Sequence, residues 1–514
     1  MNGIIELEIK FQVEQDQAMA WLQKLHSSEM AKSRIEVHFV RSTYYDTLDL
    51  HIHRQLRSSL RHRMNAGRQD LTLKSDFLPS DTVLVRKEIT QNLETGCDID
   101  TAIARLCDTH IGNNLTSPCR PVFCTDIIRH KLLVSHGSAE IEVVYDRGDI
   151  RSKCDGDRHA SISEIEFEKV SGSDGDLFDF IAKQLSGQEW VQLSYSKAQR
   201  GYALVNKSER FRPRKHHPIA SEGLDPGQLF MANMHASVQH LLDNNPVYLK
   251  DKPNAIHQTR VAIRRIRAIL RLFKDQLSYF DRKALNGELR WLQAKLGVSR
   301  DWYVLYSETL SRMDFLSDKE LEHIEKVARF QHERELKKGL AIYRSARAQR
   351  LITHIQGWLA RDPLRPTLSI ERLRYKAFKR NTIRLQAIGD VIASFHEDLQ
   401  DVHATRIIGK KFRYALEIFP STEDQKLVAN LAQMQEYLGT VNDIDRALNL
   451  ILTHDKINLS ARTRNKLLKW GKQQASIYVH RAVPHLDAII AHDISTPALT
   501  QNDCESPDLP YSHK

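Results

Sequence analysis

Charged side chains occupy alternate positions near the start of the chain. Glu6, Glu8 and Lys10 alternate with three large apolar residues. Because successive side chains of a β-strand point to opposite faces, the two carboxylates and the ammonium group are expected on one face. Carboxylates there could bind a divalent cation, and the lysine could neutralise a phosphate. A half-solvated sheet with a mixed-charge outer face would explain this segment by itself. The other strands must therefore distinguish a solvated face from a ligand-binding face.

Several other strand-like segments carry charges of mainly one sign. Glutamates alternate around Glu142 and Glu166, whereas arginine and lysine dominate LRHR, LTLK and IIRHKLL. This segregation predicts that carboxylates hold metal ions and cations hold a long anion within one enclosed site. Magnesium and manganese prefer oxygen ligands and bind through carboxylates together with substrate phosphates. Attack of a metal-activated water on the terminal phosphorus would then hydrolyse a phosphoanhydride.

The elements that must position these residues lie in the first 205 residues. A period of two dominates residues 1–205, with helical spacing at 16–25 and 174–185. Turn chemistry separates the strands, and Asp146-Arg147-Gly148 is one of the segments that favour a turn. The pattern predicts an α+β domain, and the one-sided charge predicts that its antiparallel strands form a closed β-barrel.

The hydrophobic periodicity changes after residue 205. Residues 206–227 have almost no apolar periodicity and predict a linker. Residues 228–494 follow a 3.6-residue period and predict an all-α helical-bundle domain. The polar, proline-containing segment 495–514 predicts a disordered tail.

The helical half contains two copies of one cationic pattern. The motif HxxR(V/I)xx(R/K)(R/K)xR begins at His257 and again 146 residues later at His403, and a Leu-Gly pair with an aspartate follows each copy. The cations of each copy fall on one stripe of a helix. A solvated basic face would explain either copy alone, but the repetition favours an anion-binding surface. The segment RLRYKAFKR adds Arg372, Lys376, Lys379 and Arg380 on a neighbouring helix.

Composition limits the class of protein. The 514 residues carry a formal net charge of +10, which indicates an anionic partner. No apolar run approaches the roughly 18 residues of a membrane span, and the acidic start of the chain lacks the pattern of a secretory signal. The six cysteines form no metal-ligand or disulfide spacing. Aromatic residues do not interleave with the helical cations, so nucleic acid is an unlikely partner. We expect a cytoplasmic protein with reduced thiols.

Five motifs in the first half occur in the order of a known family. ExExK at 6–10, YYDT at 44–47, LRHR at 60–63, LTLK at 71–74 and SKAQRGY at 196–202 resemble the CYTH domain of the triphosphate tunnel metalloenzymes. The resemblance implies an antiparallel tunnel that binds Mg²⁺ or Mn²⁺ and a triphosphate.

The resemblance also assigns roles to residues of this sequence. It implies catalytic roles for Glu6, Glu8 and Lys10, and metal binding by Glu6, Glu8, Glu164 and Glu166. Because Glu168 continues the alternation, the register of this late acidic strand stays open. The basic positions that match the family's substrate ligands are Lys10, Arg61, Arg63, Lys74, Arg86, Arg129, Lys197 and Arg200.

The repeated motif of the helical half resembles the CHAD domain, which is associated with inorganic polyphosphate. The implied polyphosphate-binding residues are His257, Arg260, Arg264, Arg267, Arg372, Lys376, His403, Arg406, Lys410 and Arg413. Together the two resemblances predict an enzyme that hydrolyses inorganic triphosphate to diphosphate and phosphate. A polyphosphate-binding protein without catalysis is one alternative. A CYTH enzyme acting on another triphosphate, such as thiamine triphosphate or a nucleotide that is cyclised, is the other.

Overall fold

The computed structural model describes most of the chain. The described residues are 7–65, 67–75, 88–94, 96–112, 115–152, 159–206, 211–216, 219, 223–365, 368–393, 399–419 and 424–492. They form two compact units. The first comprises Met1–Arg214, Leu242–Asp251 and Tyr343–Asp362, and the second comprises Lys215–Leu241, Lys252–Ile342 and Pro363–Lys514.

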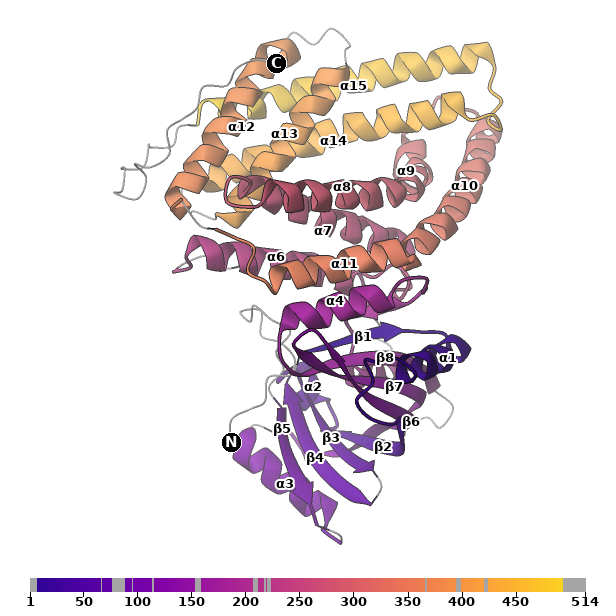
Figure 1. Ribbon diagram of the computed structural model, residues 1–514. Coiled ribbons are helices and arrows are strands. Elements are labelled where there is room, and N and C mark those ends of the chain that lie inside the picture. Colours follow the sequence, from indigo (N-terminus) through magenta and orange to yellow (C-terminus); the bar gives the residue numbers. More distant parts are fainter. Residues whose placement is uncertain are drawn as a thin grey trace. The chain divides into compact units, whose positions relative to one another are not determined.

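The first unit is built on one antiparallel sheet (Figure 1). Its order among the described residues is β5-β4-β3-β2-β6-β7-β8-β1-β9. The strands are β1 (Glu8–Gln12), β2 (Glu36–Asp46), β3 (Ser58–Asn65), β4 (Arg68–Ser75), β5 (Glu88–Leu93), β6 (Arg120–His136), β7 (Ala139–Ser152), β8 (His159–Ser171) and β9 (Val191–Leu193). The helices are α1 (Gln15–His26), α2 (His51–Arg54), α3 (Ile99–His110), α4 (Asp174–Gln184), α5 (Lys197–Val205) and α11 (Ala346–Leu359).

One face of the sheet is apolar and forms the main core of this unit. Ile9, Phe11 and Phe167 are almost fully buried against α1 and α4, which lie beside β7 and β8 in Figure 1. Trp21 of α1 and Trp190 pack edge to face with ring centroids 4.7 Å apart. Because the side chains of β1 and β8 alternate, burying this face directs their charged residues to the opposite face.

The edges of the sheet are not hydrogen-bonded to each other. Within the described residues, no ladder joins β5 to β9, so the predicted closed barrel is not confirmed. Two side chains of later segments cover the outer edge of β9 instead. Gln192 donates its backbone N–H to Gln349 Oε1 at 2.9 Å, and its carbonyl accepts from Asn245 Nδ2 at 3.1 Å. These amides satisfy backbone groups that a neighbouring strand would otherwise pair.

The second unit is helical. Its elements are α6 (Pro226–Asp243), α7 (Lys252–Leu272), α8 (Tyr279–Lys295), α9 (Gly297–Val304), a π-helical turn (Leu305–Thr309), a 3₁₀ turn (Leu310–Arg312), α10 (Asp318–Arg344), α12 (Ile370–Ala393), α13 (Leu399–Ile418), α14 (Gln425–Thr453) and α15 (Ala461–Ile490). The two copies of the cationic repeat form α7 and α13. Apolar side chains of α12 to α15 form one core, and those of α9, α10, α14 and α15 form another.

The structure bears on several further expectations. Two segments that follow the expected linker, 242–251 and 343–362, group with the sheet and not with the other helices. The predicted boundaries at 205 and 228 stay a prediction, and the predicted tail lies outside the described residues. None of the described helices combines the length and apolar composition that a membrane crossing requires. No disulfide involves the four cysteines in the described part of the chain, which are Cys97, Cys107, Cys119 and Cys124.

Candidate functional site

Strand register places the predicted charged residues on one face of the sheet. Lys10 of β1 lies directly opposite Glu166 of β8, and Glu8 lies opposite Glu168. On the other side of β8, Glu164 lies opposite Asp146 of β7, and Asp146 lies opposite Arg129 of β6. We call the face of the sheet that carries these paired residues the charged face. Because residues directly opposite each other in a ladder share a face, the acidic and basic strands converge on one surface.

Three carboxylates form a compact buried group on this face. Asp146, Glu164 and Glu166 each present a ligand oxygen, and these oxygens all lie within 4.8 Å of one another. Asp146 and Glu164 are fully buried, and Glu166 is 7% exposed. Oxygen ligands at this separation fit a hard divalent cation such as Mg²⁺ or Mn²⁺. We call these three residues the acidic cluster.

Cations surround the acidic cluster closely. Lys197 Nζ lies 2.8 Å from Asp146 Oδ2 and 2.7 Å from Glu166 Oε1, and it also pairs with Glu164. Arg129 donates to both oxygens of Asp146, at 2.8 and 2.6 Å, in a bidentate pair. Arg200 Nη1 lies 2.7 Å from Glu164 Oε2. The cluster therefore has a counter-ion on each of its carboxylates.

Neighbouring cations favour the ionised forms of Asp146 and Glu166. Burial alone would raise the pKa of Glu166, but the ammonium groups of Lys197 and Lys10 outweigh burial and hold this pKa well below its usual value. Burial likewise opposes the charge on Asp146, yet Lys197 and Arg129 lower its pKa. Burial would lower the pKa of Lys197, and the carboxylates of Asp146 and the two glutamates raise it well above the ordinary value.

Lys10 connects the ExExK motif to the acidic cluster. Its Nζ lies 3.0 Å from Glu8 Oε1 and 3.4 Å from Glu166 Oε1. Glu8 is therefore near the cluster, although it is not one of the three carboxylates whose ligand atoms meet within 4.8 Å. Glu6 and Arg86, which the resemblance assigns to metal and substrate, lie outside the described residues.

Helix α5 positions Lys197 and Arg200. Ser196 caps the helix, because its side chain accepts from the Gln199 N–H at 3.1 Å while Gln199 Oε1 accepts from the Ser196 N–H at 3.0 Å. Gly201 allows the helix to lie against Phe123, since a Cβ on this glycine would be 2.0 Å from the phenylalanine ring. The motif SKAQRGY thus combines the cap, the two cations and the close contact.

The basic positions on β3 and β4 form a second charged region of the same face. Arg61 Nη2 lies 3.6 Å from Glu88 Oε1, and Lys74 Nζ lies 2.8 Å from Glu88 Oε2. Arg63 lies beside Arg61, and the positive charge of Arg61 together with burial lowers the pKa of Arg63 to about 10. Its buried Nε has no hydrogen-bond acceptor among the described residues. An unsatisfied buried donor beside a second guanidinium suits an anionic ligand.

Sequence reasoning missed Asp146. The segment Asp146-Arg147-Gly148 favours a turn by composition, but β7 continues through it to Ser152. Gly148 lies closely against β6, where a Cβ would be 1.9 Å from the carbonyl oxygen of Asp126. The available signal was parity, because Asp146 has the same strand parity as Glu140 and Glu142. The prediction of a turn there was wrong, since close packing between strands also requires glycine.

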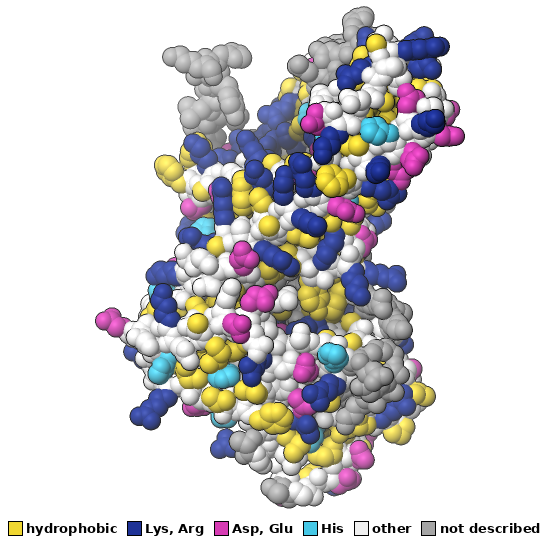
Figure 2. All heavy atoms as spheres, turned by 90° about the vertical axis from the view of Figure 1, so that its right-hand side faces the viewer, with side chains coloured by type: hydrophobic (Ala, Val, Ile, Leu, Met, Phe, Trp, Pro, Cys, Tyr) yellow, Lys and Arg dark blue, Asp and Glu magenta, His cyan; other side chains and the backbone are white. Residues whose placement is uncertain are grey.

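In the helical unit, the two repeats bring their cations together. Burial and the neighbouring cations Arg406 and Arg264 lower the pKa of Lys410 to about 6. Burial and the cations Arg300 and Arg264 lower the pKa of His257 to about 4. Asp301 raises the pKa of Arg260, and Asp443 raises the pKa of Arg406 and Lys410, but burial and the neighbouring like charges outweigh these two carboxylates. We call the residues His257, Arg260, Arg264, Arg406 and Lys410 the basic cluster. Figure 2 shows Lys and Arg side chains gathered over the helices of this unit.

The Leu-Gly motifs that follow each repeat help to position the arginines. Arg260 Nη1 donates to the Gln293 carbonyl oxygen at 2.6 Å, and a Cβ on Gly297 would be 2.2 Å from that Nη1 atom. The glycine therefore leaves room for the guanidinium. The aspartate of the same motif, Asp301, pairs with Arg446.

The remaining predicted residues of this unit differ in their surroundings. Arg267 hydrogen-bonds to Asn286 and Gln293, both at 2.9 Å, and Arg413 pairs with Glu417 at 3.2 Å. His403 Nδ1 lies 3.1 Å from Asn442 Oδ1. Arg372 and Lys376 lie on α12. Burial is the largest cause that lowers the pKa of Arg271, and the cations of α12 that add to it are Arg384 and Arg380. The sequence analysis did not include Arg384 among the polyphosphate-binding residues.

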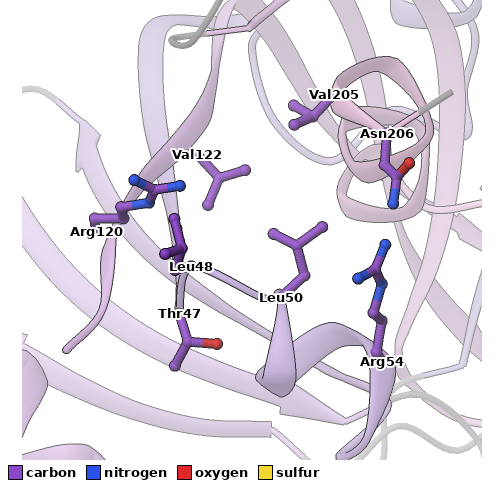
Figure 3. A pocket seen from close by; sticks show the side chains of 8 residues that line it. All are labelled: Thr47, Leu48, Leu50, Arg54, Arg120, Val122, Val205 and Asn206. Atoms are coloured by element: carbon purple, nitrogen blue, oxygen red, sulfur yellow. The ribbon is translucent and has the colours of Figure 1, made fainter. Parts of the chain in front are cut away.

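A small cavity of about 220 Å³ lies elsewhere in the first unit (Figure 3). Four aliphatic side chains, two arginines, a threonine and an asparagine line it, namely Thr47, Leu48, Leu50, Arg54, Arg120, Val122, Val205 and Asn206. None of the predicted site residues is among them, so this cavity is separate from the acidic cluster.

Comparison with known families identifies both halves. Residues 5–202 match the CYTH domain, and residues 232–452 match the CHAD domain. An inorganic triphosphatase from Haemophilus influenzae is 35% identical over 173 residues, which are 33% of this chain and 47% of that protein. The match thus spans about half the length of this relative.

Two solved structures are also similar. The CHAD domain from the plant Ricinus communis has 25% sequence identity and a TM-score of 0.42, with coverage of 54% of this chain and 95% of that one. The Hippeastrum protein HpAC1, for which a dominant triphosphatase activity is described, has 17% identity and a TM-score of 0.29, with coverage of 42% and 100%.

Proposed function

Because this chain contains a CYTH domain followed by a CHAD domain, we propose that it hydrolyses inorganic triphosphate to diphosphate and phosphate with Mg²⁺ or Mn²⁺. One observation carries the proposal: a buried group of three carboxylates lies against lysines and arginines on one face of a sheet. The name of the Haemophilus relative supports an inorganic substrate.

The residues of the acidic cluster would hold the divalent ion. Their chemistry fits, because all three offer carboxylate oxygens, and neighbouring cations lower the pKa of Asp146 and of Glu166. When bound, such an ion polarises phosphoryl oxygens and activates water. Glu8, which reaches the cluster through Lys10, is the member of the ExExK motif that we propose as an additional ligand.

The cations of the charged face would bind and orient the phosphates. Arg129 is fixed by its bidentate pair with Asp146, so its position needs little reorganisation when substrate arrives. Arg61, Arg63 and Lys74 lie on β3 and β4, beyond β2 in the same sheet, and would neutralise the rest of the anion. We propose that the sheet curves around the anion as a tunnel, with Arg86 and Glu6 completing the set that the resemblance implies.

Phosphate release from tripolyphosphate tests this function. We expect release that requires Mg²⁺ or Mn²⁺ and that falls at least about 100-fold in Glu166→Gln, because one electrostatic contact to a transition state supplies roughly this factor. Glu140→Gln is the matched control, since Glu140 is exposed on β7 and its carboxylate contacts Ser171 at 3.3 Å.

The same assay separates the alternatives. Release without metal, or equal loss in both variants, would contradict the proposal. Faster turnover of thiamine triphosphate or a nucleoside triphosphate would assign another substrate to the same site. No turnover of any triphosphate, with retained polyphosphate binding, would leave a binding protein.

We also propose that the basic cluster of the helical unit binds inorganic polyphosphate. Burial and the mutual repulsion of its cations outweigh the nearby carboxylates Asp301 and Asp443, so the positive charge is costly in the free protein. A polyphosphate titration with Arg264→Ala and Lys410→Ala measures this role. Unchanged affinity in the double variant would contradict it and favour a solvated basic face.

A further inference from the structure

Lys197 lies inside the acidic cluster. Its ammonium group contacts all three carboxylates, at 2.8 Å for Asp146 and 2.7 Å for Glu166, with Glu164 as the third partner. An ammonium group has three protons, so each carboxylate can accept one of them. The Nζ atom therefore holds the position at which the three ligand oxygens meet.

A divalent ion would need the same oxygens. The three ligand atoms lie within 4.8 Å of one another, which provides one common position for a cation. An ammonium ion and a divalent ion cannot both occupy it, because they would overlap and repel each other in a buried environment. The side chain of Lys197 is 12% exposed, so solvent screens this repulsion poorly.

The charges around the site are balanced as the structure stands. The four carboxylates of Glu8, Asp146, Glu164 and Glu166 face the four cations of Lys10, Arg129, Lys197 and Arg200. A divalent ion adds two positive charges, so restoring the balance requires that cations leave the carboxylates, that an anion enters, or both.

Of the cations that pair with Asp146 or Glu164, Lys197 can leave more readily than Arg129 or Arg200. Arg129 is bound to Asp146 through two hydrogen bonds, and Arg200 is also bound to the Ser161 carbonyl oxygen at 2.6 Å. Lys197 is the first residue of α5, and four methylene groups join its ammonium group to the backbone. A rotation of this side chain can therefore move the charge without moving a strand.

We propose that Lys197 occupies the cation position of the acidic cluster in the metal-free protein, gives way to the divalent ion, and then places its ammonium group on the phosphates. This inference rests on the proposed function. It couples the two ligands, because metal binding releases a cation for the substrate. Lys197 therefore competes with metal as well as binding substrate.

Metal affinity in the absence of substrate tests the exchange. We measure Mn²⁺ binding to the full chain by the electron paramagnetic resonance signal of the free ion. Lys197→Gln and Lys197→Met should bind Mn²⁺ at least about tenfold more tightly than the natural chain, because the competing cation is removed. Damage to the site would weaken binding, so a gain in affinity cannot come from misfolding.

Lys131→Met is the matched control. Lys131 lies on β6 and pairs with Glu142 at 2.5 Å, outside the acidic cluster. Its removal changes the net charge by the same amount. Equal tightening in this control, or no tightening in the Lys197 variants, would overturn the exchange. If the natural chain binds no Mn²⁺, the proposed metal dependence fails instead.

Thermal unfolding accompanies each titration. Lys197→Gln keeps a hydrogen-bonding group and is the milder change. A Lys197 variant that unfolds without metal and refolds with Mn²⁺ would support the exchange, since the carboxylates then need a replacement cation. If both Lys197→Gln and Lys197→Met stay unfolded at saturating Mn²⁺, the exchange is overturned.

Discussion

The two Leu-Gly motifs of the helical unit allow a matched test of how the basic cluster is built. A Cβ on Gly297 would lie 2.2 Å from Arg260 Nη1, whereas the nearest atom to a Cβ on Gly439 is Arg406 Nε at 3.9 Å. Gly297→Ala should therefore displace a guanidinium, and Gly439→Ala should not. The obstructed atom is the end of a flexible side chain, so the protein should still fold.

The expected magnitudes follow from these contacts. Displacing Arg260 removes its 2.6 Å hydrogen bond to Gln293, which is worth about 1 kcal/mol. Alanine in place of glycine stabilises a helix by up to about 1 kcal/mol. The free energy of unfolding of Gly297→Ala should thus change by less than about 1 kcal/mol. Loss of a charged hydrogen bond to phosphate is worth about 1.5 to 3 kcal/mol, so polyphosphate affinity should fall by about 10- to 100-fold.

Titration with polyphosphate at one fixed ionic strength, together with thermal unfolding, measures both quantities. Gly439→Ala should keep the affinity of the natural chain and gain slightly in stability. Equal affinity in the two variants would refute this account of the motif, whether both bind normally or both bind weakly. Arg260→Ala provides the reference for complete loss of the guanidinium.

Three further predictions concern other contacts. Asp146→Asn should lower metal-dependent phosphate release at least about 100-fold, whereas Asp149→Asn, whose carboxylate is 41% exposed on the same strand, should retain activity in the same assay. Because the pKa of Lys410 in the free protein is about 6, Lys410 must take up a proton when a polyanion binds above that pH. The affinity for polyphosphate should therefore rise as pH falls from 8 to 6, by at most about tenfold per pH unit. Calorimetry in two buffers should detect this proton uptake, and Lys410→Met should abolish it. Gly201→Ala should destabilise the first unit by about 1 to 3 kcal/mol in denaturant unfolding, because its Cβ would overlap Phe123, and a normal stability would contradict the packing of α5.

Much of the sheet could be predicted from alternation alone. A strand buried on one face fixes its register, so Lys10, Glu164 and Glu166 had to share a surface once Ile9 and Phe167 were buried. The comparisons confirm the two domain types. The roles of individual site residues stay proposals, because geometry shows their proximity and not their chemistry.

Other features depend on tertiary contacts that sequence patterns do not encode. Asp146 was missed because a glycine two residues later indicates a turn as readily as close strand packing. The contribution of Arg384 depends on how α12 packs near Arg271. Closure of the barrel was predicted from charge on one face, but charge does not determine whether the edge strands meet.

Helix α11 has a consequence for attempts to separate the two domains. It lies in the CHAD half of the sequence, yet Gln349 covers the edge of β9, and Arg361 just after it pairs with Asp179 at 2.7 Å. A recombinant fragment that stops near residue 206 would therefore present an uncovered strand edge and would be prone to edge-to-edge aggregation. A soluble fragment of the first unit should instead retain both 242–251 and 343–362, joined through short artificial connections.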